Sequence, residues 1–87
     1  MDKASKARLK GNILRAIESM STEINDRAKR VAYLRARSDS AYSDGNSEQW
    51  EAYDERIQLH QNKMELAISK QAKFRNALLS LSDVRAA

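Results

Sequence analysis

The sequence of 87 residues contains no cysteine and no proline, only two glycines and a single histidine. Without cysteine the chain forms neither a disulfide nor a thiolate metal site, and one histidine is too few for a site built from histidine ligands. Proline and glycine are the residues least compatible with helix interiors, so their scarcity favours long uninterrupted helices. We therefore expect an all-α protein without a metal or other cofactor.

The chain also lacks long apolar runs. No stretch is long enough to span a bilayer, and Arg15 interrupts the segment closest to the apolar core of a secretory signal. No nucleophile–base pair, phosphate-binding loop or cofactor fingerprint is present, and the acidic residues at 48, 51, 54 and 55 have no cavity to shelter a catalytic carboxyl. We expect a cytoplasmic, non-enzymatic protein with no membrane contact and no small-molecule substrate.

What the chain does contain is a heptad pattern in each half. An alternating spacing of three and four residues keeps one stripe of a helix against a partner helix along its whole length. We call the positions on this stripe the seam. In the first half the seam positions are Ile13, Ile17, Met20, Ile24, Arg27, Val31 and Leu34. In the second half they are Trp50, Tyr53, Ile57, His60, Met64, Ala67, Gln71, Phe74, Leu78 and Leu81.

Between the two patterns lies the one strong turn signal, an Asp-Gly-Asn sequence at residues 44–46. Gly45 is suited to the left-handed conformation that ends a helix, and Asn46 followed by Gln49 fits an N-cap of the next helix. The sequence predicts a single domain over residues 1–87, with helix one at about 3–40, a turn at about 41–46, helix two at about 47–82 and a short tail at 83–87.

A short turn between two long helices predicts an antiparallel, coiled-coil-like hairpin. The predicted pairing brings Val31 and Leu34 against Trp50 and Tyr53, and residues 20 and 24 against residues 60 and 64. A lone hairpin leaves half of each large apolar side chain exposed. We therefore expect two hairpins to form a homodimeric four-helix bundle, with the relative orientation of the copies left open.

Polar residues interrupt the seam at Arg27, His60 and Gln71. Single polar residues at core heptad positions commonly fix register and oligomeric state at some cost in stability. We interpret all three in that way. For His60, a half-buried ring hydrogen-bonded across the seam is the expected arrangement, with a role as a pH-sensitive seam residue as the alternative.

Two sets of residues are candidates for binding a partner protein. Tyr42, Trp50 and Tyr53 lie near the turn among acidic residues, and aromatic side chains are favoured anchors at interfaces. Leu59 and Leu66, seven residues apart, form a second stripe on helix two together with Ala52. The alternatives are that the aromatic residues close the bundle and that the leucines are ordinary exposed residues.

Charge is distributed unevenly around the net value of +4. Residues 1–38 carry ten basic and four acidic residues, residues 39–55 carry six acidic and no basic residues, and residues 56–87 carry six basic and two acidic residues. A basic cluster far from the turn indicates an alternative function in nucleic-acid binding. Its residues are Lys3, Lys6, Arg8, Lys10, Arg15, Lys70, Lys73 and Arg75.

The predicted outline resembles the N-terminal coiled-coil arm of bacterial transcript-cleavage factors, which enter RNA polymerase. Asp44 and Glu48 near the turn, followed by Tyr53, carry this resemblance. The spacing is one residue longer than in that arm, and no function is carried over from it. In size and charge the chain also resembles small plasmid-encoded RNA-binding four-helix bundles, an analogy of architecture alone.

Overall fold

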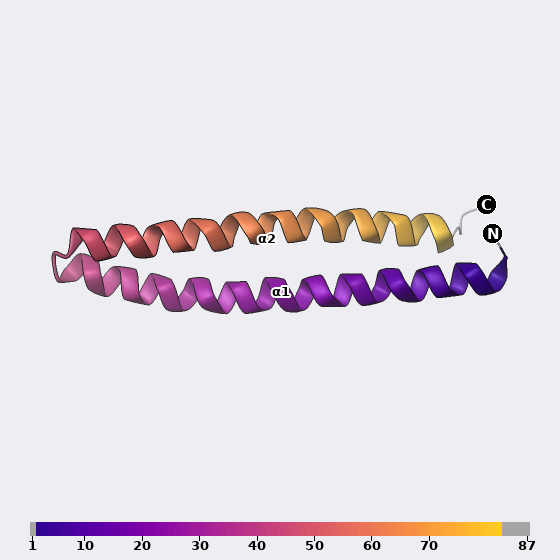
Figure 1. Ribbon diagram of the computed structural model, residues 1–87, viewed down its shortest axis with the longest axis horizontal. Coiled ribbons are helices and arrows are strands. Elements are labelled where there is room, and N and C mark those ends of the chain that lie inside the picture. Colours follow the sequence, from indigo (N-terminus) through magenta and orange to yellow (C-terminus); the bar gives the residue numbers. More distant parts are fainter. Residues whose placement is uncertain (1, 83–87) are drawn as a thin grey trace.

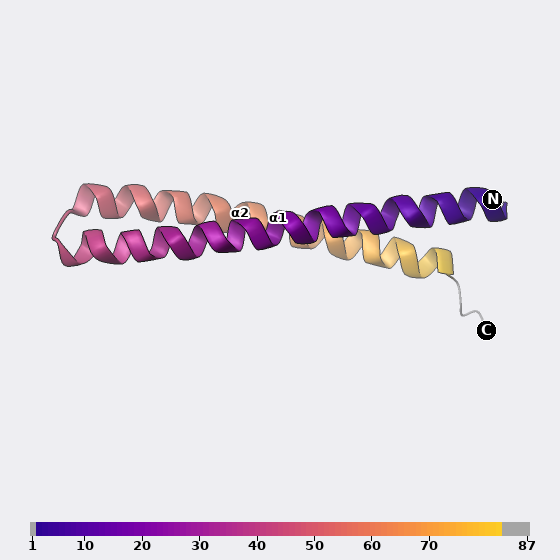
Figure 2. The same ribbon diagram turned by 90° about the horizontal axis from the view of Figure 1, so that it is seen from below.

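The computed structural model describes residues 2–82, which form two long helices packed against each other as an antiparallel hairpin (Figure 1). Helix α1 spans Lys3–Ser43 and helix α2 spans Ser47–Ser82. Figure 2, turned by 90°, shows the two helices crossing near the middle of the rod, so they wind around each other. The rod measures 63 × 20 × 13 Å. The predicted helical hairpin is confirmed, and the tail predicted at 83–87 lies outside the described residues.

The chain reverses direction at one end of the rod, which we call the tip. Asn46 N donates to the carbonyl of Ala41 at 2.9 Å, and Gly45 N donates to that of Tyr42 at 3.0 Å. This pair of bonds is a Schellman motif, in which glycine takes the left-handed conformation, and Gly45 has a φ of 75°. Gln49 N donates to Asn46 Oδ1 at 3.1 Å, so Asn46 caps α2 as the sequence predicts.

The other end of the rod, which we call the open end, holds the start of α1. Here Asp2 caps the helix by accepting a hydrogen bond of 2.7 Å from Ser5 N. The same hydrogen bond from the Ser5 backbone lowers the pKa of the Asp2 carboxyl. Helix α1 then continues without a break through Gly11 to Ser43.

Substitution by alanine should have opposite effects on the stability of the protein at the two glycines. A Cβ at either position has no neighbour within 4 Å. Gly11→Ala, in a regular helix, should stabilise the protein by up to about 1 kcal/mol because alanine is the better helix former. Gly45→Ala should destabilise it by about 1–2 kcal/mol because the left-handed conformation is strained for alanine. Chemical denaturation of the two variants measures both values, and a shared sign would contradict the assigned backbone conformations.

The core of the tip half is a cluster of Val31, Leu34 and Ile57, with Tyr53 and Met64 packed against it. Our pairing of Val31 and Leu34 with Tyr53 is confirmed by this cluster, whereas their pairing with Trp50 is wrong by one to two helical turns. The reason is that α1 ends at Ser43 rather than near residue 40, so the turn shrinks to residues 44–46. The start of α2 then lies beside the last turns of α1, which include the buried Ser38 and Ala41.

Hydrogen bonds across the seam show which residues of α1 and α2 face each other along the rest of the rod. The Arg27 side chain bonds to His60, and Gln71 bonds to the backbone carbonyl of Ile17. From the first of these contacts to the second, α1 runs ten residues toward its start while α2 runs eleven residues toward its end, so the two helices stay nearly in step. Our pairing of residues 20 and 24 with residues 60 and 64 is shifted relative to this register, for the same reason.

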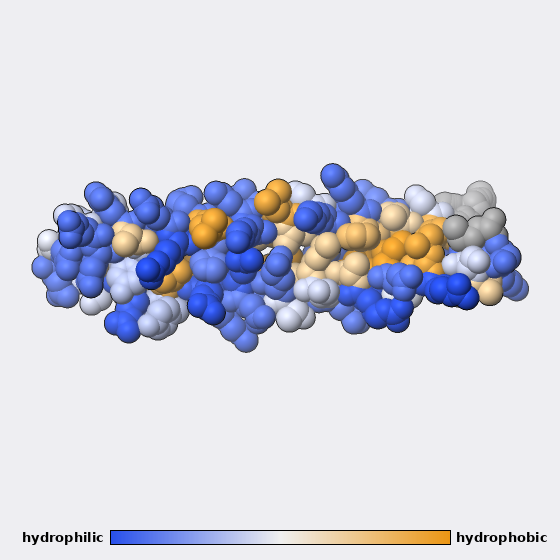
Figure 3. All heavy atoms as spheres, viewed as in Figure 1, coloured by the Kyte–Doolittle hydropathy of each residue, from blue (hydrophilic) through white to orange (hydrophobic). Residues whose placement is uncertain are grey.

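Burial of the seam differs between the two halves of the rod. The tip half contains the cluster of Val31, Leu34 and Ile57. In the open half Ile13 and Ala67 are buried, but Ile17, Met20 and Ile24 on α1 and Phe74 and Leu78 on α2 are only half-buried. Figure 3 shows apolar side chains gathered over the open half on the face in view, while the tip half is mostly polar. The hairpin alone therefore leaves much of the apolar stripe in contact with solvent.

Candidate binding surfaces

The tip presents two aromatic side chains. Tyr42 is 73% exposed and Trp50 is 37% exposed. Their ring centroids lie 6.2 Å apart with the planes tilted by 58°, an arrangement favoured by aromatic pairs. Together with residues 45–47 they line a hollow of about 250 Å³. Because the hollow is built on the Schellman turn, its walls are held by backbone hydrogen bonds.

The third aromatic residue predicted for the tip lies elsewhere. Tyr53 is half-buried and packs against the core cluster, so it supports the tip instead of adding to its surface. The heptad pattern placed both Trp50 and Tyr53 on the seam, and that assignment is wrong for Trp50, which lies at the end of the helix pair and is exposed. We leave Tyr53 out of the tip surface, which consists of Tyr42 and Trp50.

Leu59 and Leu66 are both exposed on α2, at 53% and 61%. Leu66 borders a groove of about 440 Å³ halfway along the rod, between the two helices. The groove is lined by Ser19, Met20, Glu23, Arg27, Lys63, Leu66, Ala67 and Lys70. Sequence reasoning missed this groove because its existence depends on which residues face each other across the seam.

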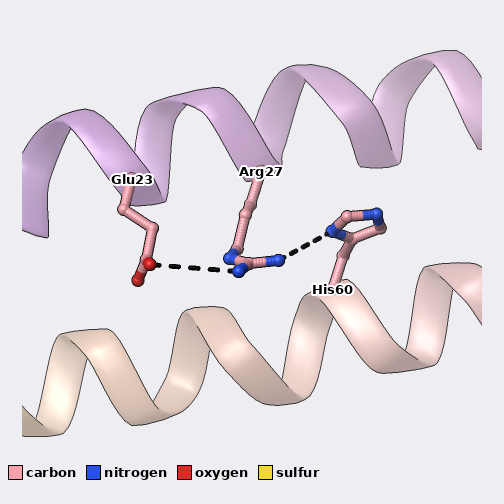
Figure 4. Close-up of polar contacts among 3 residues, drawn as sticks. All are labelled: Glu23, Arg27 and His60. Carbon is pink, nitrogen blue, oxygen red and sulfur yellow. Dashed lines mark hydrogen bonds and ion pairs between the residues drawn. The ribbon is translucent and has the colours of Figure 1, made fainter.

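A polar layer crosses the seam next to the groove (Figure 4). Arg27 Nη1 reaches from α1 to His60 Nδ1 on α2 at 3.0 Å. Since a guanidinium only donates, Nδ1 of the ring accepts and His60 is neutral in this arrangement. Glu23 lies 3.9 Å from Arg27 Nη2 as a partly exposed ion pair, while Arg27 Nε is buried without a partner. The hydrogen-bonded ring predicted for His60 is confirmed.

The environment of His60 opposes its protonation. Burial lowers the pKa of the His60 ring first, and the positive charges of Arg27, Arg30 and Lys63 lower it further. Protonation also removes the lone pair that accepts the bond from Arg27. The folded state therefore favours the neutral form of the His60 ring.

The pKa shift of His60 predicts a pH-dependent stability. Because the folded pKa lies below the unfolded value of about 6.5, the contribution is fully present above that value. It is lost as the pH falls below 6.5 toward the folded pKa, because the unfolded chain then binds more protons. Urea unfolding of the wild type and His60→Gln between pH 8 and 5 should show their stability difference shifting in favour of the variant on acidification. A difference independent of pH would contradict the assigned environment.

A second polar layer lies toward the open end. The buried Gln71 amide donates to the backbone carbonyl of Ile17 at 3.0 Å and to Ser21 Oγ at 2.6 Å. A buried polar group is retained only where hydrogen bonds compensate its desolvation, and Gln71 has two. The two polar layers are eleven residues apart on α2 and hold the helices in one register.

The predicted basic cluster lies in the open half but not on a single face. Lys6 and Lys10 lie seven residues before the seam residues Ile13 and Ile17 and are half-buried, whereas Lys70 lines the mid-rod groove. The other members are exposed, and they are Lys3, Arg8, Arg15, Lys73 and Arg75. The positive charges therefore surround the open end instead of forming one continuous stripe.

Within residues 2–82, no group of three His, Asp or Glu residues is placed to hold a metal ion. Neither described helix has a stretch long and apolar enough to cross a membrane. No protein-family model, curated protein or solved structure matches this chain.

Proposed function

We propose that this chain is a non-enzymatic helical hairpin of the cytoplasm that self-associates and binds a partner protein through its tip. The observation that carries the proposal is the exposed Tyr42–Trp50 pair at the tip of the hairpin. Large aromatic side chains contribute most to affinity when they are held in one conformation before binding. The backbone bonds of the turn and the capped start of α2 supply that order.

Charge around the tip narrows the class of partner. Residues 39–55 contain six acidic residues and no basic residue. Such a surround attracts a basic surface and repels an acidic one, which affects the rate of association and the choice of partner. We propose a partner that offers an apolar pocket for the aromatic pair, bordered by lysine or arginine.

The proposal for self-association has a separate support. Large apolar side chains remain exposed along the rod beyond the tip, among them Leu14 at 48%, Leu66 at 61% and Leu79 at 69%. A hairpin of this size buries a modest share of its apolar surface alone, and a second copy covers more of it.

An affinity experiment with matched aromatic variants tests binding through the tip. Tyr42→Ala/Trp50→Ala removes the exposed pair, and Tyr33→Ala removes an aromatic side chain that is 58% exposed on α1 away from the turn. Proteins retained by the wild type and by Tyr33→Ala should be lost with the tip variant, while circular dichroism shows unchanged helicity. Equal retention by all three proteins would refute binding through the tip.

The alternative function is nucleic-acid binding by the open half of the rod, supported by the basic residues that surround it. A mobility-shift assay with unrelated DNA and RNA at two salt concentrations distinguishes the two. Binding that weakens steeply with salt, and whose salt dependence flattens in Lys70→Gln/Lys73→Gln/Arg75→Gln, would favour the alternative. The protein-binding proposal predicts no such binding.

A further inference from the structure

The mid-rod groove lies on one side of the seam, which we call the groove face. A step of one residue turns a helix by about 100°, so Ile68, which directly follows the groove residue Ala67, lies on the other side, the opposite face. Residues at intervals of seven share a face. The rows of the groove face run through Ser19, Glu23, Lys63 and Leu66, and those of the opposite face run through Leu14, Glu18, Glu65 and Ile68.

The two faces carry opposite charge. The rows of the groove face contain three acidic residues, Asp2, Glu23 and Asp26, and six basic residues, which are Arg30, Arg37, Arg56, Lys63, Lys70 and Lys73. The rows of the opposite face contain two basic residues, Arg35 and Arg75, and five acidic residues, which are Glu18, Asp39, Glu51, Asp54 and Glu65. In the part of the chain that the structure describes, the only ion pair joins Glu23 and Arg27, so neither set of charges is neutralised within the chain.

Exposed apolar side chains lie at matching levels on the two faces. Leu66 beside the groove is 61% exposed, and Ile68 on the opposite face is 50% exposed. Toward the open end, Leu9 on the groove face is 37% exposed and Leu79 on the opposite face is 69% exposed. Leu9 and Leu79 are level because each lies eight residues beyond the hydrogen-bonded pair of Ile17 and Gln71. The two faces of one chain therefore complement each other in charge and in apolar contacts.

We propose that copies of this chain stack in the same direction, with the groove face of one copy against the opposite face of the next. This inference rests on the self-association in the proposed function and specifies its geometry. Ile68 of one copy enters the mid-rod groove of the next beside Leu66, and Leu79 packs on Leu9. Because the two paired faces differ, every copy at an end of the stack has one face free, and the assembly does not close at two copies.

Charge selects the direction of stacking. In the same direction, Asp54 lies over Arg56 and Glu65 over Lys63, since members of each pair are two residues apart on one helix, or about 3 Å along it. In the opposite direction, Glu65 stays at mid-rod because α2 runs from residue 47 to residue 82, and it comes beside Glu23 of the other copy. Asp54 then moves away from Arg56 toward the open end. Only the same direction places opposite charges together at these positions.

A third pair joins the α1 helices of neighbouring copies. Asp39 lies over Arg37, whose guanidinium stacks 5.3 Å from the centre of the Tyr33 ring while its Nε donates to Tyr33 Oη at 3.0 Å. Arg37 is thus held in place before a second copy binds. Arg35 and Arg75 face like charges in the stack. The charges therefore set the direction, and the apolar contacts supply most of the affinity.

Two variants of neighbouring residues block one face each. Leu66→Glu places a charge beside the groove, and Ile68→Glu places the same charge on the opposite face. Sedimentation equilibrium should show wild-type masses that rise beyond two chains with concentration, whereas each variant alone associates at least about tenfold more weakly and stays monomeric. Ser69→Glu is the matched control, because Ser69 is exposed on neither face, and it should assemble as the wild type does.

Mixing the two blocked variants gives the decisive result. The unaltered opposite face of Leu66→Glu should bind the unaltered groove face of Ile68→Glu, so an equal mixture forms a dimer with one copy of each and grows no further. Dimerisation of either variant alone would overturn the pairing of unlike faces, because it shows a face that pairs with itself. A mixture that stays monomeric, or a wild-type mass that stops at two chains, would overturn it too.

Spin labels at Ser43→Cys on both members of this mixed dimer test the direction, because the chain has no cysteine of its own. Ser43 ends α1 at the tip and lies on neither face. Packed helices lie about 8–10 Å apart, so the two labels should lie within about 30 Å of each other. A distance close to the rod length of 63 Å would overturn stacking in the same direction.

Failure of the stack and failure of the proposed function give different results. A wild-type chain that stays monomeric at hundreds of micromolar would refute self-association together with the stack. Self-association of the wild type with dimerisation of one blocked variant would refute the stack alone. Tip binding by Tyr42 and Trp50 is judged separately by the affinity experiment.

Discussion

Ile57→Ala should lower the Tm of this protein by roughly 10–25 °C, corresponding to a loss of about 2–4 kcal/mol. Ile57 is 6% exposed and belongs to the cluster with Val31 and Leu34, so truncation leaves a cavity between the two helices. A domain of this size has a total stability of only about 4–13 kcal/mol. Thermal unfolding followed by circular dichroism measures the change.

The matched control is Ile68→Ala on the same helix. Ile68 is 50% exposed, so the same truncation removes less buried area and replaces a β-branched residue by a better helix former. We expect a change below about 1 kcal/mol. Equal destabilisation by the two variants would contradict the burial of Ile57 between the helices.

Arg27→Leu/His60→Leu should stabilise the hairpin by about 1–3 kcal/mol and raise its Tm by roughly 5–20 °C. Placing the Arg27 guanidinium between the helices costs desolvation free energy. In return it makes one hydrogen bond, to His60, and one long ion pair, to Glu23, while its Nε is buried without a partner. Replacing Arg27 and His60 by leucine removes that desolvation cost and makes the seam apolar at this level, while Glu23 is 49% exposed and stays in contact with water. Denaturant unfolding at pH 8 measures the difference.

The single variants should behave differently from the double variant. His60→Leu leaves Arg27 without its acceptor, so it should be less stable than the double variant. The double-mutant cycle gives the coupling energy of the layer. A double variant less stable than the wild type would show that the layer stabilises the fold on balance. The gain in stability should come with a loss of register specificity, seen as a broader distribution of label distances across the seam.

The helices and their reversal could be predicted because their signals are local. The heptad positions of α2 from Tyr53 to Leu81 are all buried or half-buried, and Gly45 and Asn46 adopt the capping roles that their residue types favour. The register could not be predicted from the same signals. Polar Ser38 and small Ala41 continue the seam of α1 by burial alone, without the apolar character that marks a heptad.

The surfaces followed from the sequence only in part. Exposure of Tyr42, Leu59 and Leu66 agrees with their positions off the seam, because a residue off the seam points away from the partner helix. The mid-rod groove could not be predicted without the register of the two helices, because its lining residues, such as Met20 and Ala67, come from different helices. Chemical recognition of a partner needs the partner's surface as well, and one chain contains only half of that information.

The antiparallel hairpin itself is tested most directly by one intramolecular distance. Spin labels at Asn12→Cys and Asn76→Cys, both exposed positions of the open half, are diluted with unlabelled protein so that each pair reports on one chain. The hairpin predicts a separation of about 20–30 Å, two neighbouring helix widths with the label arms. A separation near 95 Å, the length of 64 residues of continuous helix, would contradict the reversal at Gly45.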